Sequence, residues 1–516
     1  MNNRQVIKNK NTARIGLFSS ITILISAVVG IGIFFKNKSV LGNNDSNGYG
    51  VLISWTIAAV ITLTTALAFV EIISSDKKQN GSGLAGWARI ICGHKVGRFI
   101  LIVMPMFYFL FKLVDTSFFA SESILIIFNQ PQIDPISGAS TMIISQDTWI
   151  IVLVAYVLML LFIGVNAFST KAAKIISVIA SVAKFLPLIV VGILGITFGA
   201  INGWSGNFFT NITQQGGSNE ILPLGIFASL PALLFTFDSF LTIGNAASSM
   251  NNPQRDVPRS ILIGIPIITF LYLFVTVGQL VTGQRDVYAF FNHIVVQSGG
   301  AIDGIAAKTL NVIVGCVIMI SLFGSINAFV LTSIRSLQSA IDEEIIIGAV
   351  KFKKLANGRH LRAGALYGAF IGTIVSGIMA IPIVVLNSDS AYDGVSNLPT
   401  LFFFMIYALI ILFGLINHYT HKVEVKRMKI FPIVAIIAIL GCAFAFGYNL
   451  FYEFTARNFI DDKQVSWGMF KGQSIDRWIA SVLVWAFLIV FIALPFINDA
   501  CIKLFRKNHN QRLIWM

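Results

Sequence analysis

Long apolar runs alternate with short polar segments along the whole chain, and they predict membrane-spanning helices. Each run is close to or above the length of about 20 residues with which a helix crosses a bilayer. The runs are continuous rather than alternating, which favours helices over the strands of a barrel. The pattern therefore predicts an all-α membrane protein with twelve transmembrane helices, at residues 15–35, 50–74, 97–128, 148–168, 172–199, 221–247, 258–281, 304–334, 363–386, 397–417, 430–449 and 478–500.

Two of these runs contain residues that weaken a helix near its middle. The first includes SAVVGIGIFFK, residues 26–36, in which Gly30 and Gly32 lie at mid-depth although glycine is a poor helix former. The sixth has Asp238 at its centre beside hydroxyl side chains, which compete for backbone hydrogen bonds. The two runs are five spans apart, as in inverted five-helix repeats with discontinuous first helices. Close helix packing is the other explanation of the glycines, but the pairing with the sixth run favours two broken helices.

A broken helix supplies chemistry that a small zwitterion can use. Amides at the start of the second half-helix carry partial positive charge and suit a carboxylate, and carbonyls that end the first half suit an ammonium group. We therefore expect a solute to bind between the two breaks.

The composition supports a membrane location throughout. Apolar residues make up 56% of the chain, charged residues 12%, and the mean hydropathy is +0.80, whereas soluble domains are about a quarter charged. The first run is too long for a signal peptide and has no small-residue cleavage site. The outer segment 450–477 is expected to form a small cap, because it carries aromatic and charged residues.

The net charge of +14 is explained by basic residues that gather mainly on one side of the membrane, so it does not indicate a nucleic-acid partner. With an inner N-terminus, 27 of the 37 Lys and Arg residues lie in inner segments, seven lie outside and three lie within spans. This asymmetry follows the positive-inside rule. It places the arm 1–14 and the tail 501–516 in the cytoplasm of a cell-membrane protein, with basic clusters facing anionic lipid.

Other function classes find little support. The four cysteines are scattered without metal-ligand spacing, and the few histidines lie in loops, so we expect no metal, no cofactor and no enzymatic site. Repeated charges or carbonyl rings that would line a channel are not evident. The chain has no signalling domain, although a non-transporting sensor of the same fold stays open as an alternative.

Charged residues inside the spans mark candidate functional positions, because they are costly in hydrocarbon. Lys184 lies deep in the fifth span and needs partners, which we expect to be carbonyls of a broken helix. It could couple transport to protons or pin two helices together. Lys112 and Asp115 share one helical face, and an internal ion pair is the favoured interpretation. Glu71, at the inner end of the second span, is expected to be structural.

The sixth span contains FTFDSF and is followed by NNPQRDVPRSILIG, residues 251–264, which carries the pattern N-P-x-R-x-x-P-R. This and several other segments resemble the amino acid–polyamine–organocation superfamily of permeases, of which that pattern after the sixth span is a strong mark. The resemblance covers about residues 15–345 well and the remainder by span count. Further matches are GIGIF (30–34), ALAFVEI (66–72), GSGLAGWARIICG (81–93), VNAFSTKAAKIISVIASVAKFLPLIVVGI (165–193) and NAFVLTSIRSLQSA (327–340).

The resemblance implies a fold and a site. The fold would be a 5+5 inverted repeat of the LeuT-like kind, with repeats at 15–200 and 221–417 and peripheral helices at 430–500. Amides of Gly30, Ile31 and Gly32 would bind the substrate carboxylate, and carbonyls of Ala27 and Asp238 its amino group. Phe235 would be an aromatic gate, Ser239 would belong to the break, and Lys184 would match the lysine of proton-coupled members.

The chain also departs from the superfamily pattern. Ser239 replaces the usual glycine, Leu241 the following acidic residue, and Ser248 and Ser249 the paired glutamates before N-P. The implied function is a secondary amino acid transporter that works by alternating access, through proton symport or amino acid exchange. A polyamine or cationic amino acid antiporter is the alternative. The sequence leaves the substrate and the oligomeric state open.

Overall fold

We analysed a computed structural model of the chain. It describes residues 16–44, 47–75, 83–128, 132–133, 140–141, 148–201, 223–241, 243–244, 250, 252–282, 287–297, 304–357, 361–386, 394–457 and 477–514. The predicted outer cap at 450–477 falls mostly outside these ranges, and so do Ser248 and Ser249.

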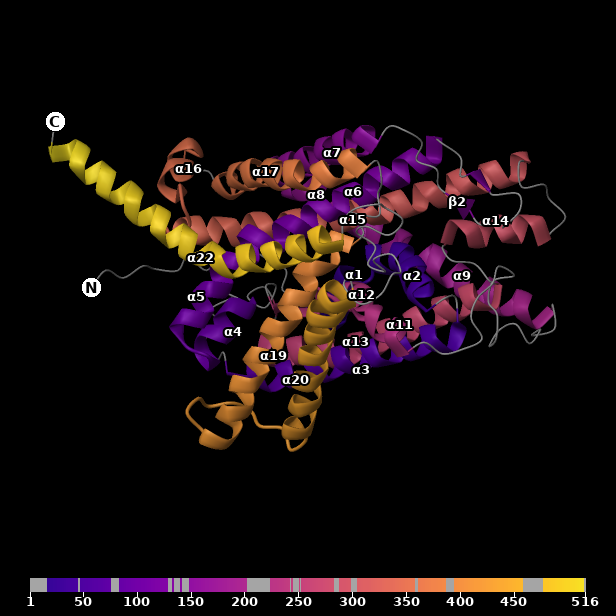
Figure 1. Ribbon diagram of the computed structural model, residues 1–516, viewed down its shortest axis with the longest axis horizontal. Helices are drawn as coiled ribbons and strands as arrows, with labels where there is room; N and C mark the ends of the chain where they lie inside the picture. The colour runs from indigo at the N-terminus through magenta and orange to yellow at the C-terminus, as the bar shows by residue number, and fades with distance from the viewer. Residues whose placement is uncertain are drawn as a thin grey trace.

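The described residues are almost entirely helical (Figure 1). One short antiparallel pair, β1 and β2, is formed with Gln132 opposite Thr141. The elements are α1 (Leu17–Val28), α2 (Ile31–Asn43), α3 (Gly48–Ile73), α4 (Gly83–Ile91), α5 (His94–Val103), η1 (Met104–Tyr108), α6 (Phe109–Phe128), β1 (Gln132–Ile133), β2 (Ser140–Thr141), α7 (Thr148–Phe168), α8 (Thr170–Ala183), α9 (Phe185–Ile201), α11 (Pro223–Ala228), α12 (Leu230–Phe237), α13 (Pro253–Thr282), α14 (Val287–Gln297), α15 (Ile305–Asp342), α16 (Ala349–Leu355), α17 (Arg362–Leu386), α19 (Asn397–Thr420), α20 (Phe431–Gly447), η3 (Tyr448–Ala456) and α22 (Arg477–Ile514).

The spanning helices agree with the apolar runs. Within the described ranges, ten helices are long and apolar enough to cross a membrane, and the bent pair α1–α2 makes eleven. The sixth run corresponds to the shorter helices α11 and α12. The all-helical membrane fold is therefore confirmed, while the count of twelve and the inverted repeat stay predictions. Large outward side chains such as Phe270, which is 71% exposed, suit contact with lipid.

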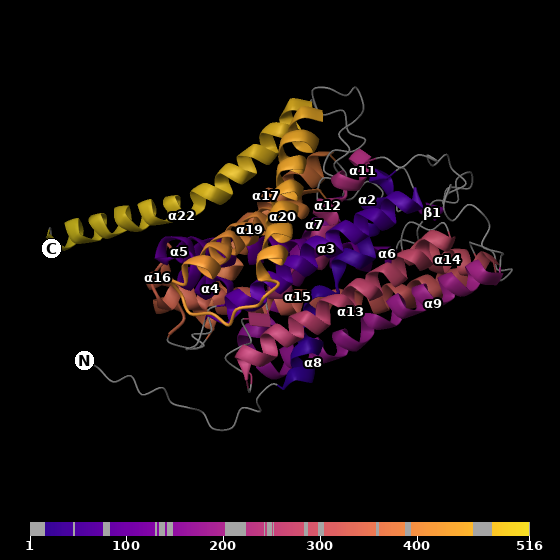
Figure 2. The ribbon, with the colours of Figure 1, turned by 90° about the horizontal axis from the view of Figure 1, so that it is seen from below.

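The short helix α12 packs against α2, α3 and α19. Figure 2 shows α13 and α9 side by side along one flank, with α22 projecting away from the body toward the C-terminus. Glycines allow the close approach of α9 and α13, because a Cβ on Gly195 would lie 2.4 Å from the carbonyl oxygen of Gly278. The core includes α2, α12 and α6, whose facing side chains are largely buried.

Several helix ends differ from the predicted ones. The first span does not end at residue 35, because α2 continues to Asn43. Lys36, which the charge count placed outside, is fully buried within α2 because its ammonium finds partners inside the protein. The eleventh span continues as η3 to Ala456. Helix α22 runs to Ile514 and takes in most of the predicted cytoplasmic tail.

Both predicted breaks are present. Helices α1 and α2 are bent by 42° at Val29–Gly30, and Gly30 adopts φ −166° and ψ −133°. The prediction that the helix also breaks at Gly32 was wrong, because Gly32 already lies in the first turn of α2. Helix α12 ends at Phe237, and Ser239 has a left-handed backbone with φ 72°. Ser239 thus adopts a conformation that favours glycine, the residue it replaces, and its amide donates to Asp238 Oδ1 over 2.7 Å.

Candidate functional site

The break in the first span leaves amide groups at the start of α2. Gly30 is the N-cap of this helix and provides no side-chain acceptor. The amides of the first turn, which include Ile31 and Gly32, have no partner within the helix. They carry the positive end of the helix dipole, which makes this terminus suited to an anionic group. The structure thus places the three predicted carboxylate-binding residues together.

The glycines of this break also serve packing. A Cβ on Gly32 would lie 2.5 Å from the Cα of Thr236, so α2 and α12 meet with no room for a methyl group. A Cβ on Gly30 would lie 3.0 Å from the Oγ of Ser325 on α15. Both explanations of the sequence motif therefore hold, with the break at Gly30 and close helix packing at Gly32.

Lys184 binds the carbonyl end of α1. It stands at the junction of α8 and α9 and is almost fully buried. Its Nζ donates to the carbonyl of Ser26 over 2.5 Å and to that of Val29 over 2.9 Å. A cation at a helix C-terminus is favourable because it meets unpaired carbonyls and the negative end of the dipole. The expected partners of Lys184, the carbonyls of a broken helix, are confirmed.

Ala27 lies in the same last turn of α1 and is half-buried. In that turn its carbonyl has no partner within the helix. Tyr272, on α13, connects this end of α1 with α12, because its hydroxyl lies 3.1 Å from the carbonyl oxygens of both Val28 and Thr236. One phenol thus contacts both broken helices. No pattern in the sequence marked Tyr272, because its role depends on two segments that meet only in the fold.

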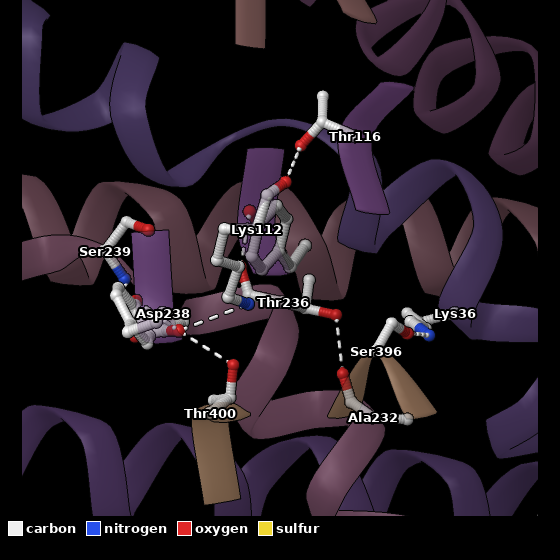
Figure 3. Close-up of polar contacts among 11 residues, drawn as sticks. Lys36, Lys112, Thr116, Ala232, Thr236, Asp238, Ser239, Ser396 and Thr400 are labelled. Carbon is white, nitrogen blue, oxygen red and sulfur yellow. Dashed lines mark hydrogen bonds and ion pairs between the residues drawn. The ribbon is translucent and has the colours of Figure 1, made fainter. Parts of the chain in front are cut away.

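Asp238 is the centre of a buried polar cluster (Figure 3). Its Oδ2 accepts hydrogen bonds from the Tyr108 hydroxyl over 2.6 Å and the Thr400 hydroxyl over 2.8 Å. The Lys112 Nζ lies 3.2 Å from the same oxygen, and both charged side chains are almost fully buried. Four elements meet here, because Tyr108 ends η1, Lys112 belongs to α6, Thr400 belongs to α19, and Asp238 is the C-cap of α12.

The ring of Phe235 is close to two buried ammonium groups. The Lys112 Nζ is 3.5 Å from the centroid of its ring, and the Lys36 Nζ is 4.7 Å from it. Lys36 also donates to Ser396 Oγ over 2.7 Å and lies 5.3 Å from the Phe119 ring. Ammonium groups over aromatic faces are attracted by the ring quadrupole. The residue predicted as an aromatic gate is thus held by cations on α2 and α6.

The partner of Lys112 differs from the sequence interpretation. Helical spacing favoured Asp115, which does interact electrostatically with Lys112, but the carboxylate oxygen that lies 3.2 Å from the Lys112 Nζ belongs to Asp238. The physical reason is that the end of α12 brings a carboxylate to the buried face of α6, which a local rule for one helix does not include. Tyr108 and Thr400 were missed for the same reason.

Phe237 and Glu71 are surrounded by packing and hydrogen-bonding partners. Phe237 packs against Trp55 and Tyr272, with ring centroids 5.7 Å and 5.3 Å away. Glu71 is buried, with its Oε1 2.8 Å from His418 Nδ1 and its Oε2 accepting from the Met428 amide over 2.8 Å. The structural interpretation of Glu71 agrees with these contacts. Within the described part of the chain, no group of three or more His, Cys, Asp or Glu residues could hold a metal ion.

Comparisons with known proteins identify the family. The family model for amino acid permeases matches residues 15–469. An uncharacterized protein of Mycoplasma pneumoniae is 23% identical over 492 residues, which cover 84% of this chain and 83% of that protein. The mouse large neutral amino acids transporter small subunit 2 is 25% identical over 338 residues, covering 62% of this chain and 56% of that protein.

A third relative covers most of both chains. The serine/threonine exchanger SteT of Bacillus subtilis is 20% identical over 453 residues, which span 84% of this chain and 91% of that protein. These two named relatives are described as a transporter and an exchanger, not as enzymes. The multiple apolar helices, the broken first span and the family match agree with one another. The chain belongs to the amino acid permease family and is a multi-pass membrane protein.

Proposed function

We propose that this chain is a secondary transporter that carries amino acids across the cell membrane by alternating access. The observation that carries the proposal is the pair of broken helices whose ends share the Tyr272 hydroxyl. Backbone groups at the ends of interrupted helices lack partners within their own helix, so they can provide the polar contacts that a solute needs at membrane depth, where water is absent. The family membership supports amino acids as the substrate.

The substrate backbone would bind across the first break. Its carboxylate would accept from the amides of Gly30, Ile31 and Gly32, and its ammonium would donate to carbonyls at Ala27 and Asp238. This arrangement uses both ends of the interrupted helix dipoles. Phe235 would cover the bound substrate and move when the site opens. Ser239 would allow that movement, because its backbone already leaves the helical region.

The side chain of the substrate would be neutral. A cationic amino acid or a polyamine needs an available carboxylate, and Asp238 already contacts Lys112 and two hydroxyl groups. This engagement favours a neutral substrate over the cationic antiport alternative. One relative is named a transporter of large neutral amino acids and another a serine/threonine exchanger, which also supports neutral side chains.

Lys184 would couple the transport cycle to protons. Its ammonium bridges the carbonyls of Ser26 and Val29 at the break in the first span. Loss of its proton would remove the charge that holds these carbonyls and would change how firmly α1 is held. An exchange mechanism, in which no proton moves, would use the same lysine only to fix the helix end.

Transport in liposomes tests the proposal. Purified protein would be reconstituted, and uptake of labelled neutral and cationic amino acids would be measured with and without an imposed pH gradient. We expect saturable uptake of a neutral amino acid that exceeds uptake of lysine. Acceleration by an inward proton gradient would support symport, and uptake only into amino-acid-loaded liposomes would support exchange. Absence of uptake for all amino acids under both conditions would reject the transporter proposal.

We also propose that both termini face the cytoplasm, because the basic residues gather on that side. A membrane-impermeant maleimide can test this in sealed cells through Cys501 of α22. Burial raises the pKa of the Cys92 thiol to about 12, so Cys92 would react slowly at neutral pH. We expect Cys501 to be labelled only after permeabilisation, and labelling of intact cells would reverse the orientation.

A further inference from the structure

The ammonium of Lys112 occupies surroundings that suit any small organic cation. It lies 3.2 Å from Asp238 Oδ2 and 3.5 Å from the centroid of the Phe235 ring. A carboxylate beside an aromatic face is a combination that binds alkylammonium groups by charge and by the ring quadrupole. Solvent is almost excluded, since the Lys112 and Asp238 side chains are 2% and 1% exposed. Both attractions are therefore stronger than at a surface.

The Asp238 carboxylate is held in place by groups other than Lys112. Tyr108 and Thr400 donate to the same carboxylate oxygen over 2.6 Å and 2.8 Å, and the Ser239 amide donates to the other oxygen over 2.7 Å. These donors come from η1, α19 and the end of α12. The carboxylate would therefore keep its orientation if the lysine side chain were removed.

The Asp238 carboxylate also lies beside the proposed substrate position. Phe235 and Thr236 belong to the last turn of α12, and Thr236 is packed against Gly32 of α2. An amino acid bound to the first-turn amides of α2 would direct its side chain near this turn. Asp238 would attract a side-chain cation if Lys112 did not already neutralise it.

We propose that Lys112 is a specificity-determining residue that fills an ammonium-binding subsite formed by Asp238 and Phe235. The tethered ammonium takes the place of a substrate cation, so amino acids with a cationic side chain are excluded. The exclusion of cationic substrates rests on the proposed transport function, whereas the subsite itself does not. Removal of the lysine leaves a vacant site for an alkylammonium ion of similar size.

Chemical rescue of purified protein tests the subsite without transport. K112A deletes the aliphatic stem and ammonium of the lysine, and propylammonium supplies the same atoms. We expect K112A to melt at a lower temperature than the parent protein. Propylammonium should raise the melting temperature of K112A progressively with concentration, because a ligand that binds only the folded state stabilises it by mass action.

Three controls make the rescue specific. The neutral analogue 1-propanol should not stabilise K112A, and propylammonium should not stabilise the parent protein, where the subsite is filled. The variant K112A/D238N, which lacks the carboxylate charge, should also lose the response. If K112A is recovered only when propylammonium is present during extraction, that recovery supports the proposal. Equal responses of K112A and K112A/D238N, or no recovery with any ammonium ion, would overturn it.

Competition in liposomes tests specificity. Lysine and ornithine should inhibit uptake of a labelled neutral amino acid by K112A at concentrations about tenfold lower than for the parent protein, the change that corresponds to about 1.4 kcal/mol. K112R, which keeps a cation at this position, should continue to exclude them. Unchanged exclusion of lysine in an active K112A would reject the specificity role. If no variant transports any amino acid while propylammonium rescue succeeds, the subsite stands and the transport proposal fails.

Discussion

Two buried lysines of this permease are neutralised in different ways. Lys184 donates hydrogen bonds to the backbone carbonyls of Ser26 and Val29 at the end of α1. Lys112 meets the carboxylate of Asp238 and the face of Phe235. A helix terminus offers partial charges of about half a unit, whereas a carboxylate offers a full one. Lys184 therefore loses little electrostatic stabilisation when α1 moves, whereas Lys112 is bound to a fixed opposite charge on Asp238.

This difference suits two roles. A cation held by dipoles can respond to the position of α1, which is useful for coupling. A cation held by a carboxylate fixes the local charge and so suits selection among substrates. Substitutions at each position should separate the two roles, and the largest effect is expected where a full charge would lose its partner.

Replacement of Asp238 should have the largest effect. D238A leaves the Lys112 ammonium buried without its carboxylate, and removal of one partner of a buried ion pair typically costs about 3–5 kcal/mol. The melting temperature of purified protein should fall sharply. T400V, which removes a single hydrogen bond to the same carboxylate, is the matched control and should cost about 1 kcal/mol. Equal losses in the two variants would show that the charge of Asp238 contributes little.

Replacement of Lys184 should affect transport more than stability. K184M removes the cation from two carbonyls that can relax or find other donors, so a loss of about 1–3 kcal/mol is expected. Uptake driven by a pH gradient should be abolished, while exchange of internal for external amino acid persists. K308M, near the end of its span, is a control for loss of a membrane lysine and should keep gradient dependence. Gradient-driven uptake by K184M at the parental rate would leave Lys184 a structural role only.

A methyl group at Gly32 should disturb the contact between the broken helices. G32A would bring a Cβ to 2.5 Å from the Cα of Thr236, which lies on the backbone and cannot rotate away. Overpacking of this kind costs about 1–3 kcal/mol, and uptake should fall with the melting temperature.

Gly377 supplies the matched control. It lies in α17, and a Cβ there would have nothing within 4 Å. G377A should be neutral or slightly stabilising, because alanine is the better helix former by about 1 kcal/mol. Normal melting and uptake in G32A would mean that α2 and α12 are less closely packed than the structure has them.

The sequence predicted what depends on local chemistry. Run length identified the spanning helices, Gly30 marked the break in the first, and the depth of Lys184 required carbonyl partners that the structure supplies. Contacts between segments far apart in the chain could not be predicted from the local sequence pattern. Lys36 looked like an outer charge because Ser396 and Phe235 reach it only after folding.

The same limit explains the errors at the candidate site. The spacing of Lys112 and Asp115 is visible in the sequence, whereas the approach of Asp238 depends on how α12 packs against α6. Tyr108 and Thr400 carry no pattern of their own, and only the position of the carboxylate makes them part of the site.

The smallest effect is expected at the backbone beside the ion pair. Ser239 has a left-handed conformation with φ 72°, which costs a residue with a Cβ about 1–2 kcal/mol and glycine much less. S239G removes this cost and keeps the amide that donates to Asp238, but it also removes the hydroxyl that hydrogen-bonds with Tyr108, so the melting temperature should change little. S229G, inside the helical region between α11 and α12, should instead lower it, because its hydroxyl donates to the Gly225 carbonyl over 2.8 Å. A lower melting temperature for S239G would imply that the Ser239 hydroxyl, rather than its backbone, supports the Asp238 site.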